Sequence, residues 1–186
     1  MIPTITSSSL QRRKRWQKGA EVLEFTMAFL PLLVILFALL DIAWAVFSKA
    51  TLQYAVRAGV RHGITITGTQ ATAAGGCLTD IVKSTVQSNS LGLLSGSSGL
   101  AKIKVNYYQP PAPGSTSAAT DVSTQTNGNA PLNIMMVSVQ GYSLKALVPR
   151  IFGWRQAVDT AATPISVASA DLIEPSRDIP CIGTAP

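Results

Sequence analysis

The fold is decided by residues 12–61, a stretch with Gly19-Ala20-Glu21-Val22-Leu23-Glu24-Phe25 at its centre. A basic cluster, Arg12-Arg13-Lys14-Arg15 with Lys18, ends at Gly19. An apolar run follows and contains no charged residue over residues 25–40. Glu24 stands at the edge of this run, where an ionisable group is costly to desolvate. We therefore take it as the first candidate for a functional residue.

The apolar run is long enough to span a membrane. About 20 residues at 1.5 Å per residue cross a hydrocarbon core, and residues 25–47 contain Asp41 as their only charge. We predict that these residues span the membrane within one helix over residues 20–62, about 65 Å long. Pro31 lies inside this segment, and membrane helices tolerate proline better than soluble helices do.

Beyond the apolar run the helix becomes amphipathic. A polar face repeats every four residues and contains Lys49, Gln53, Arg57 and Arg61. A second stripe has the spacing of a helix that packs on a partner and contains Ala43, Phe47, Ala50, Tyr54 and Ala58. Gly63 follows the polar face and is predicted as the C-cap of the helix.

The net charge of +6 is concentrated in front of the apolar run. Five of the fifteen Lys and Arg residues precede Ala20, whereas none of the nine acids does. A nucleic-acid-binding face needs clustered positive charge on the folded part, so we expect no nucleic-acid partner. The basic cluster instead predicts a cytoplasmic N-terminus and a C-terminal part beyond a single-pass inner membrane.

The rest of the chain, residues 63–186, predicts a small folded head. Strands are expected over residues 103–107, 132–143 and about 157–173. In the first two, the inward residues are Ile103, Val105 and Tyr107, then Met135, Val137 and Val139. Pro164 interrupts the third strand, which predicts an edge or a bulge. Short helices are expected over residues 79–87 and 144–152.

These patterns together predict an α+β fold in three parts. Residues 1–19 form a basic leader peptide without fixed structure, because it has almost nothing to bury. Residues 20–62 form the long transmembrane and amphipathic helix, and residues 63–186 form the extracytoplasmic head with an antiparallel sheet. A polar loop at about residues 110–130 is expected to be mobile.

Two cysteines, Cys77 and Cys181, lie in the part expected to be exported. An oxidising compartment favours a disulfide between them. It would close a loop of roughly 100 residues and contribute about 4–5 kcal/mol in the chain-entropy model. Two unpaired buried thiols are the alternative.

No catalytic constellation is visible in the sequence. His62, the only histidine, is expected to be a surface or capping residue, and Cys77 lacks an identifiable base. No phosphate-binding loop, nucleophile elbow or metal-ligand spacing occurs, so we expect no enzyme, metal or cofactor. Gly59 and Gly63 have the spacing of helix packing between small residues. The charged residues inside that pattern and its place outside the bilayer make it a weak indication.

The spacing from Gly19 to Glu24 suggests a role for the acid. A cut after Gly19 would give Ala20 a positive α-amino group, one helical turn from the Glu24 carboxylate. In a low-dielectric setting such a pair is attractive and selective, within one subunit or between neighbours. The alternative is an interfacial acid whose side chain simply reaches water.

These residues resemble a known processing site. Gly19-Ala20, Glu24 and Phe25 after a basic leader are similar to the prepilin-peptidase site of type IV pilin-like proteins. The continuation resembles the TadE-like pseudopilins of the tight-adherence (Flp) pilus system. It includes Leu30-Pro31-Leu32-Leu33, Asp41 and Ala55-Val56-Arg57-Ala58-Gly59-Val60-Arg61. TadF-like proteins share the processing site, and the head matches only in outline.

The resemblance implies a minor pilin or pseudopilin, processed at Gly19–Ala20 by an aspartic prepilin peptidase, with Glu24 and Phe25 as assembly contacts. The implied partners are the peptidase, a major Flp-type pilin, a second TadE- or TadF-like pseudopilin, an inner-membrane assembly platform and membrane lipid. Two other readings stay open. Ala43-Trp44-Ala45 has the form of a signal-peptidase site, which would release a soluble binding protein. An uncut chain would remain a single-pass anchored protein.

Overall fold

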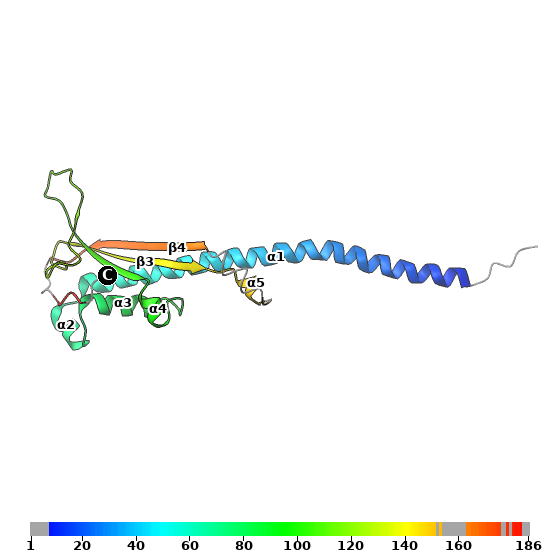
Figure 1. Ribbon diagram of the computed structural model, residues 1–186, viewed down its shortest axis with the longest axis horizontal. Helices are drawn as coiled ribbons and strands as arrows, with labels where there is room; N and C mark the ends of the chain where they lie inside the picture. The colour runs from blue at the N-terminus through cyan, green and yellow to red at the C-terminus, as the bar shows by residue number, and fades with distance from the viewer. Residues whose placement is uncertain (1–7, 152, 154–162, 176–177, 179, 184–186) are drawn as a thin grey trace, which may run out of the picture. The chain divides into compact units, whose positions relative to one another are not determined.

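The computed structural model of the protein describes residues 8–151, 153, 163–175, 178 and 180–183. The chain divides into unit 1, Met1–Ala43, and unit 2, Trp44–Pro186. The elements in chain order are α1 (Ser8–Thr65), α2 (Gly68–Ala73), α3 (Leu78–Ser88), α4 (Gly96–Leu100), β1 (Ile103–Gln109), β2 (Thr120–Asp121), β3 (Ile134–Leu144), α5 (Leu147–Ile151) and β4 (Thr163–Leu172) (Figure 1). This content confirms the predicted α+β class.

The first helix extends beyond both predicted ends. It begins at Ser8, so residues 8–18 are helical and the expectation of an unstructured leader is wrong for them. Gln, Arg and Lys are good helix formers, and neither glycine nor proline interrupts those residues. Gly63 lies inside the helix rather than at its C-cap, and Thr65 is the last helical residue. A capping box between Thr67 and Gln70 then begins α2.

The helix is long and apolar enough to cross a membrane. Among the described residues, Ala20–Thr65 is the one helix that meets this test of length and composition, with a mean hydropathy of 2.5 in its most apolar window. None of that window is buried by the rest of the chain. Its large apolar side chains are therefore left exposed by the rest of the chain.

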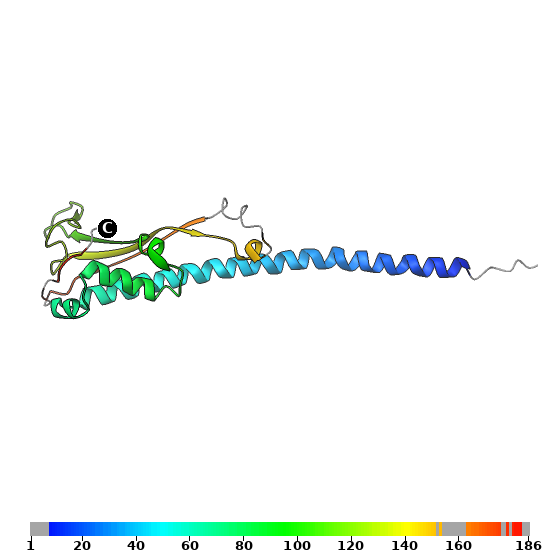
Figure 2. The same cartoon turned by 60° about the horizontal axis from the view of Figure 1, so that its bottom comes forward.

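Unit 2 has two layers. One is an antiparallel sheet of strand order β2-β1-β3-β4. The other contains α3 and the part of α1 that belongs to unit 2 (Figure 2). The alternation predicted for β1 and β3 is confirmed, since the buried core of the sheet includes Ile103, Val105, Tyr107, Met135, Val137 and Val139.

The last strand lies at the edge of the sheet, as Pro164 predicts. Pro164 pairs with Ser143, and the register between β3 and β4 shifts between Val139 and Tyr142. Gly141 in this shift has a φ of +68°, a conformation that glycine adopts without steric cost. The first part of the predicted strand, residues 157–162, lies outside the described residues.

The segment predicted as a polar loop, residues 110–130, contains β2. Its Thr120–Asp121 pair with the end of β1. Val122 and Asn129 are buried, and the Val122 N–H donates to the Tyr107 carbonyl over 2.9 Å. The short polar stretch lacks the alternation by which a strand is recognised, so its pairing depends on the neighbouring β1. The helices α2 and α4 were likewise not predicted.

Candidate functional site

The predicted processing and assembly residues lie in one exposed part of α1. Gly19, Ala20, Glu24 and Phe25 are all helical, and the last three are exposed. Because Ala20 and Glu24 are four residues apart on a helix, they share a face one turn apart. The spacing required for a contact between Glu24 and a new amine at Ala20 is therefore present in the helix.

The surroundings of Glu24 are apolar. Phe25 is 66 % exposed, and its ring stacks on that of Phe29 with 5.3 Å between centroids. The Thr26 hydroxyl donates to the Val22 carbonyl over 2.8 Å, so it is satisfied without water. Among the side chains that the structure describes, Glu24 has no ion-pair partner.

In unit 2 the exposed face of α1 contains the predicted polar repeat. Lys49, Gln53, Arg57 and Arg61 are all exposed. The predicted partner stripe is not the face that packs on the sheet, because Phe47 is 47 % and Tyr54 64 % exposed. The face that packs contains Ser48, Leu52, Ala55, Val56, Gly59, Val60 and Gly63.

The buried face of α1 includes two glycines whose role the sequence indicated only weakly. A Cβ on Gly59 would overlap the Val86 side chain of α3. A Cβ on Gly63 would lie 2.6 Å from Cγ2 of Val82 and 2.7 Å from Sδ of Met135. The small-residue spacing therefore brings α1 against α3 and β3. The charged residues within the pattern do not prevent this, because Arg61 points to the exposed side.

The cysteines tie the chain's end to the start of α3. Cys77 and Cys181 form a disulfide across 104 positions. Next to it, the N–H groups of Leu78 and Thr79 donate to the carbonyls of Cys181 and Ile182, over 2.8 and 3.0 Å. These bonds satisfy two of the N–H groups that the first turn of a helix leaves free. The N-cap residue of α3 is Cys77, which makes no side-chain bond to the helix.

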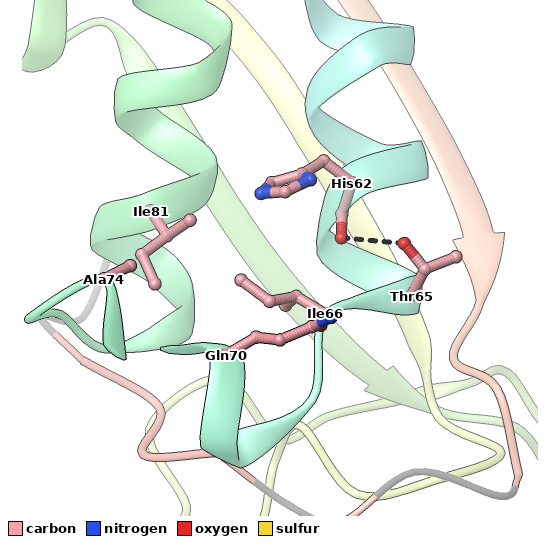
Figure 3. A pocket seen from close by; sticks show the side chains of 6 residues that line it. All are labelled: His62, Thr65, Ile66, Gln70, Ala74 and Ile81. Atoms are coloured by element: carbon pink, nitrogen blue, oxygen red, sulfur yellow. Dashed lines mark hydrogen bonds between the residues drawn. The ribbon is translucent and has the colours of Figure 1, made fainter. Parts of the chain in front are cut away.

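His62 lines an open cavity of about 510 Å³. Its ring projects from α1 toward α3, where Ile81 lies, and Ile66 and Gln70 form the side toward α2 (Figure 3). The expectation of a surface residue is confirmed, because His62 is exposed. Its carbonyl accepts bonds from Ile66 N and Thr65 Oγ1. Within the described residues, none of the side chains that line this cavity is an acid or a cysteine.

Tyr107 belongs to the sheet, as predicted. Its hydroxyl is buried and lies 3.2 Å from Oγ1 of Thr79 in α3. At the end of β1, the Ser123 hydroxyl accepts from Tyr107 N over 2.9 Å and donates to the Asp121 carboxylate. The bonds from the Ser123 hydroxyl and backbone N–H lower the pKa of Asp121 below its usual 3.8. This network fixes the turn at which the chain leaves β2.

Within the described residues, no group of three or more His, Cys, Asp and Glu side chains has an arrangement that could hold a metal ion. The feature of the described residues that most needs a partner is therefore the exposed apolar helix.

Comparison with known proteins supplies one match. Residues 19–61 match the family model described as TadE-like protein. No curated protein and no solved structure matches the chain. The matched residues include Gly19, Glu24 and the helix faces described above, and they end inside α1. This match confirms the resemblance seen in the sequence.

Proposed function

We propose that this chain, with its TadE-like segment over residues 19–61, is a minor pilin or pseudopilin required to assemble a tight-adherence (Flp-type) type IV pilus. The match itself supports a role in the Tad pilus system. Together with the apolar helix Ala20–Thr65, it indicates membrane anchoring. The assembly role, the processing enzyme and the orientation are parts of the proposal.

One observation carries the proposal more than any other. The family match begins at residue 19, the residue after which the predicted cut falls. The basic cluster at residues 12–18 lies in front of the match, as expected for a leader that is removed. The matched residues after Gly19 would then form the N-terminal helix of the mature protein.

In the proposed mechanism, the uncut chain inserts with its basic leader in the cytoplasm. A prepilin peptidase cuts between Gly19 and Ala20, which removes the positive cluster and creates an amine at Ala20. The Glu24 carboxylate then selects the position of this or a neighbouring subunit, because an unpaired charge in an apolar setting is strongly disfavoured. Phe25 and the exposed apolar side chains of α1 pack among the helices of partner subunits.

The partners proposed for this step are the peptidase, a major Flp-type pilin, a second TadE- or TadF-like pseudopilin and the inner-membrane platform. The exposed stripe with Phe47 and Tyr54 supports a role in helix contacts. Phe47 stacks on Trp44, but it is still 47 % exposed, and Tyr54 is 64 % exposed.

The decisive experiment determines the N-terminal residue of the protein purified from membranes, with and without the host's prepilin peptidase. We expect Ala20 in the presence of the peptidase and the uncut leader in its absence. A start at Val46 would support the secreted binding protein and overturn the pilin proposal. An uncut chain in both strains would leave a membrane-anchored protein that is not a peptidase substrate.

A further inference from the structure

The charges of unit 2 are unevenly distributed along its length. We call the end at which the chain enters at Trp44 the proximal end, and the opposite end the distal end. Gly63, near the end of α1, lies against Met135 at the start of β3. From there α1 leads back to Trp44 over about 29 Å, and β3 leads forward to Lys145 over about 33 Å. Lys145 and α5 therefore lie at the proximal end (Figures 1 and 2).

All five acids of unit 2 that the structure describes lie at the distal end. Asp121 pairs with Tyr108, and Asp171 pairs with Met135, both at the distal end of their strands. Glu174 and Asp178 follow β4. Asp80 lies in the first turn of α3, where the C-terminal segment binds.

The proximal end, in contrast, has cations and exposed apolar groups. Lys49 is exposed one turn into unit 2. Lys102, in contrast, lies opposite Gln140, about halfway along β3, and its Nζ is 5.9 Å from the centre of the Tyr142 ring. Lys145 follows β3, and Leu147 at the start of α5 is 37 % exposed. The other described cations are spread along α1, α3 and β1, so the polarity arises from the position of the acids.

Aromatic groups accompany these cations. Trp44 and Phe47 stack with 5.8 Å between ring centroids, and Phe47 is 47 % exposed. Tryptophan and tyrosine are enriched where a chain leaves the hydrocarbon core, and lysine side chains extend from that level to the headgroups. Trp44 directly follows the apolar segment in the sequence, so the chain enters the proximal end of unit 2 directly from that segment.

We propose that the proximal end of unit 2 docks on a bilayer surface rich in anionic phospholipid, through Lys49 and Lys145, with Leu147 at the level of the headgroups. The inference rests on the membrane anchoring of α1 proposed above. Anionic lipid attracts each of these lysines and repels the five described acids of unit 2, which lie at the distal end. Charge and chain continuity thus favour lipid as the occupant.

The test uses the full chain in lipid nanodiscs, with fluorophores on single added cysteines and the Cys77–Cys181 disulfide kept oxidised. Leu147→Cys places the probe at the proximal end. Leu132→Cys is the matched control, because Leu132 is an exposed leucine just before the distal end of β3. Leu36→Cys, in the apolar segment, reports whether the chain is inserted. Lipids with a quencher near the headgroup measure contact at residues 147 and 132, and lipids with a quencher in the acyl chain measure insertion at residue 36.

We expect lipid quenching at residue 147 but not at residue 132, and more quenching with anionic than with zwitterionic lipid. Each change of Lys49 or Lys145 to Gln should lower the ratio of quenched to unquenched probe roughly fivefold, equivalent to about 1 kcal/mol per cation. Equal quenching at 147 and 132, or no dependence on anionic lipid, would overturn the docking while leaving anchoring intact. If the probe at 36 is also unquenched, anchoring itself fails, and the docking proposal fails with it.

Discussion

Gly63 of α1 and Val82 of α3 lie so close that a Cβ atom on the glycine would stand 2.6 Å from the valine Cγ2. Gly59, one turn earlier, has the same relationship with Val86. Helix axes approach this closely only where one side chain is absent. The contact therefore depends on two glycines inside a helix, a residue type that otherwise weakens helices by about 1 kcal/mol each.

Replacement of Gly63 by alanine should destabilise unit 2 by about 1–3 kcal/mol, because the added methyl group overpacks the contact with Val82 and Met135. Chemical unfolding in detergent, followed by the circular-dichroism signal of the sheet, measures the loss. The double change Gly63→Ala with Val82→Ala is the matched control and should cost less than the sum of the two single changes. A stabilised Gly63→Ala variant would contradict the close approach.

Loss of the disulfide should destabilise unit 2. Cys77→Ser, Cys181→Ser and the double variant should each lower the free energy of unfolding by about 4–5 kcal/mol, the chain-entropy value for a loop of about 100 residues. Equal losses in the three variants would show that the bond acts as one constraint. The measurement is chemical unfolding of oxidised and reduced protein. An unchanged midpoint after reduction would refute a stabilising role.

The pKa of Asp121 should depend on Ser123. Because the folded pKa is lowered, the carboxylate stabilises unit 2 at pH values above its unfolded pKa of about 3.9. That stabilisation is lost as the pH falls through the lower folded pKa. Ser123→Ala should raise the pKa of Asp121 toward 3.8, as measured by NMR titration of the side-chain carboxyl.

Changes at the processing site should separate cleavage from assembly. Gly19→Leu should block the cut, because a large side chain replaces the glycine before the scissile bond. Glu24→Ala should still be cut after Gly19 but should abolish pilus assembly, since the Ala20 amine loses its partner. The readouts are the N-terminal residue of the membrane protein and the amount of surface pili. Normal piliation in the Glu24→Ala strain would exclude this residue as the assembly contact.

Glu21→Ala is the matched control for Glu24→Ala. It removes an exposed acid from the same part of α1, at the second position after the predicted cut. Because Glu21 is adjacent to Ala20 rather than one turn away, it does not share the face on which the amine lies. We expect this variant to be processed and piliated like the unchanged protein.

Local pattern was sufficient for the long helix and for two of the strands. Leu52 and Val56 recur on one helical face, and Val105 and Val137 fall in alternating runs, so periodicity alone separates helix from strand. It did not identify which stripe of the helix is buried. Phe47 and Tyr54 have the larger apolar side chains, yet they are exposed, because the sheet packs instead on the face with the small residues.

The sequence by itself determined the apolar helix, the candidate site around Glu24 and the α+β class, because each depends on residues close together in the chain. The tertiary structure alone decided the pairing of β2 and the capping of α3 by the chain's end. It also decided the fit of Gly63 against Val82 and the separation of acids from the proximal lysines. These features join residues up to about a hundred positions apart, and a local pattern does not encode which distant surfaces meet.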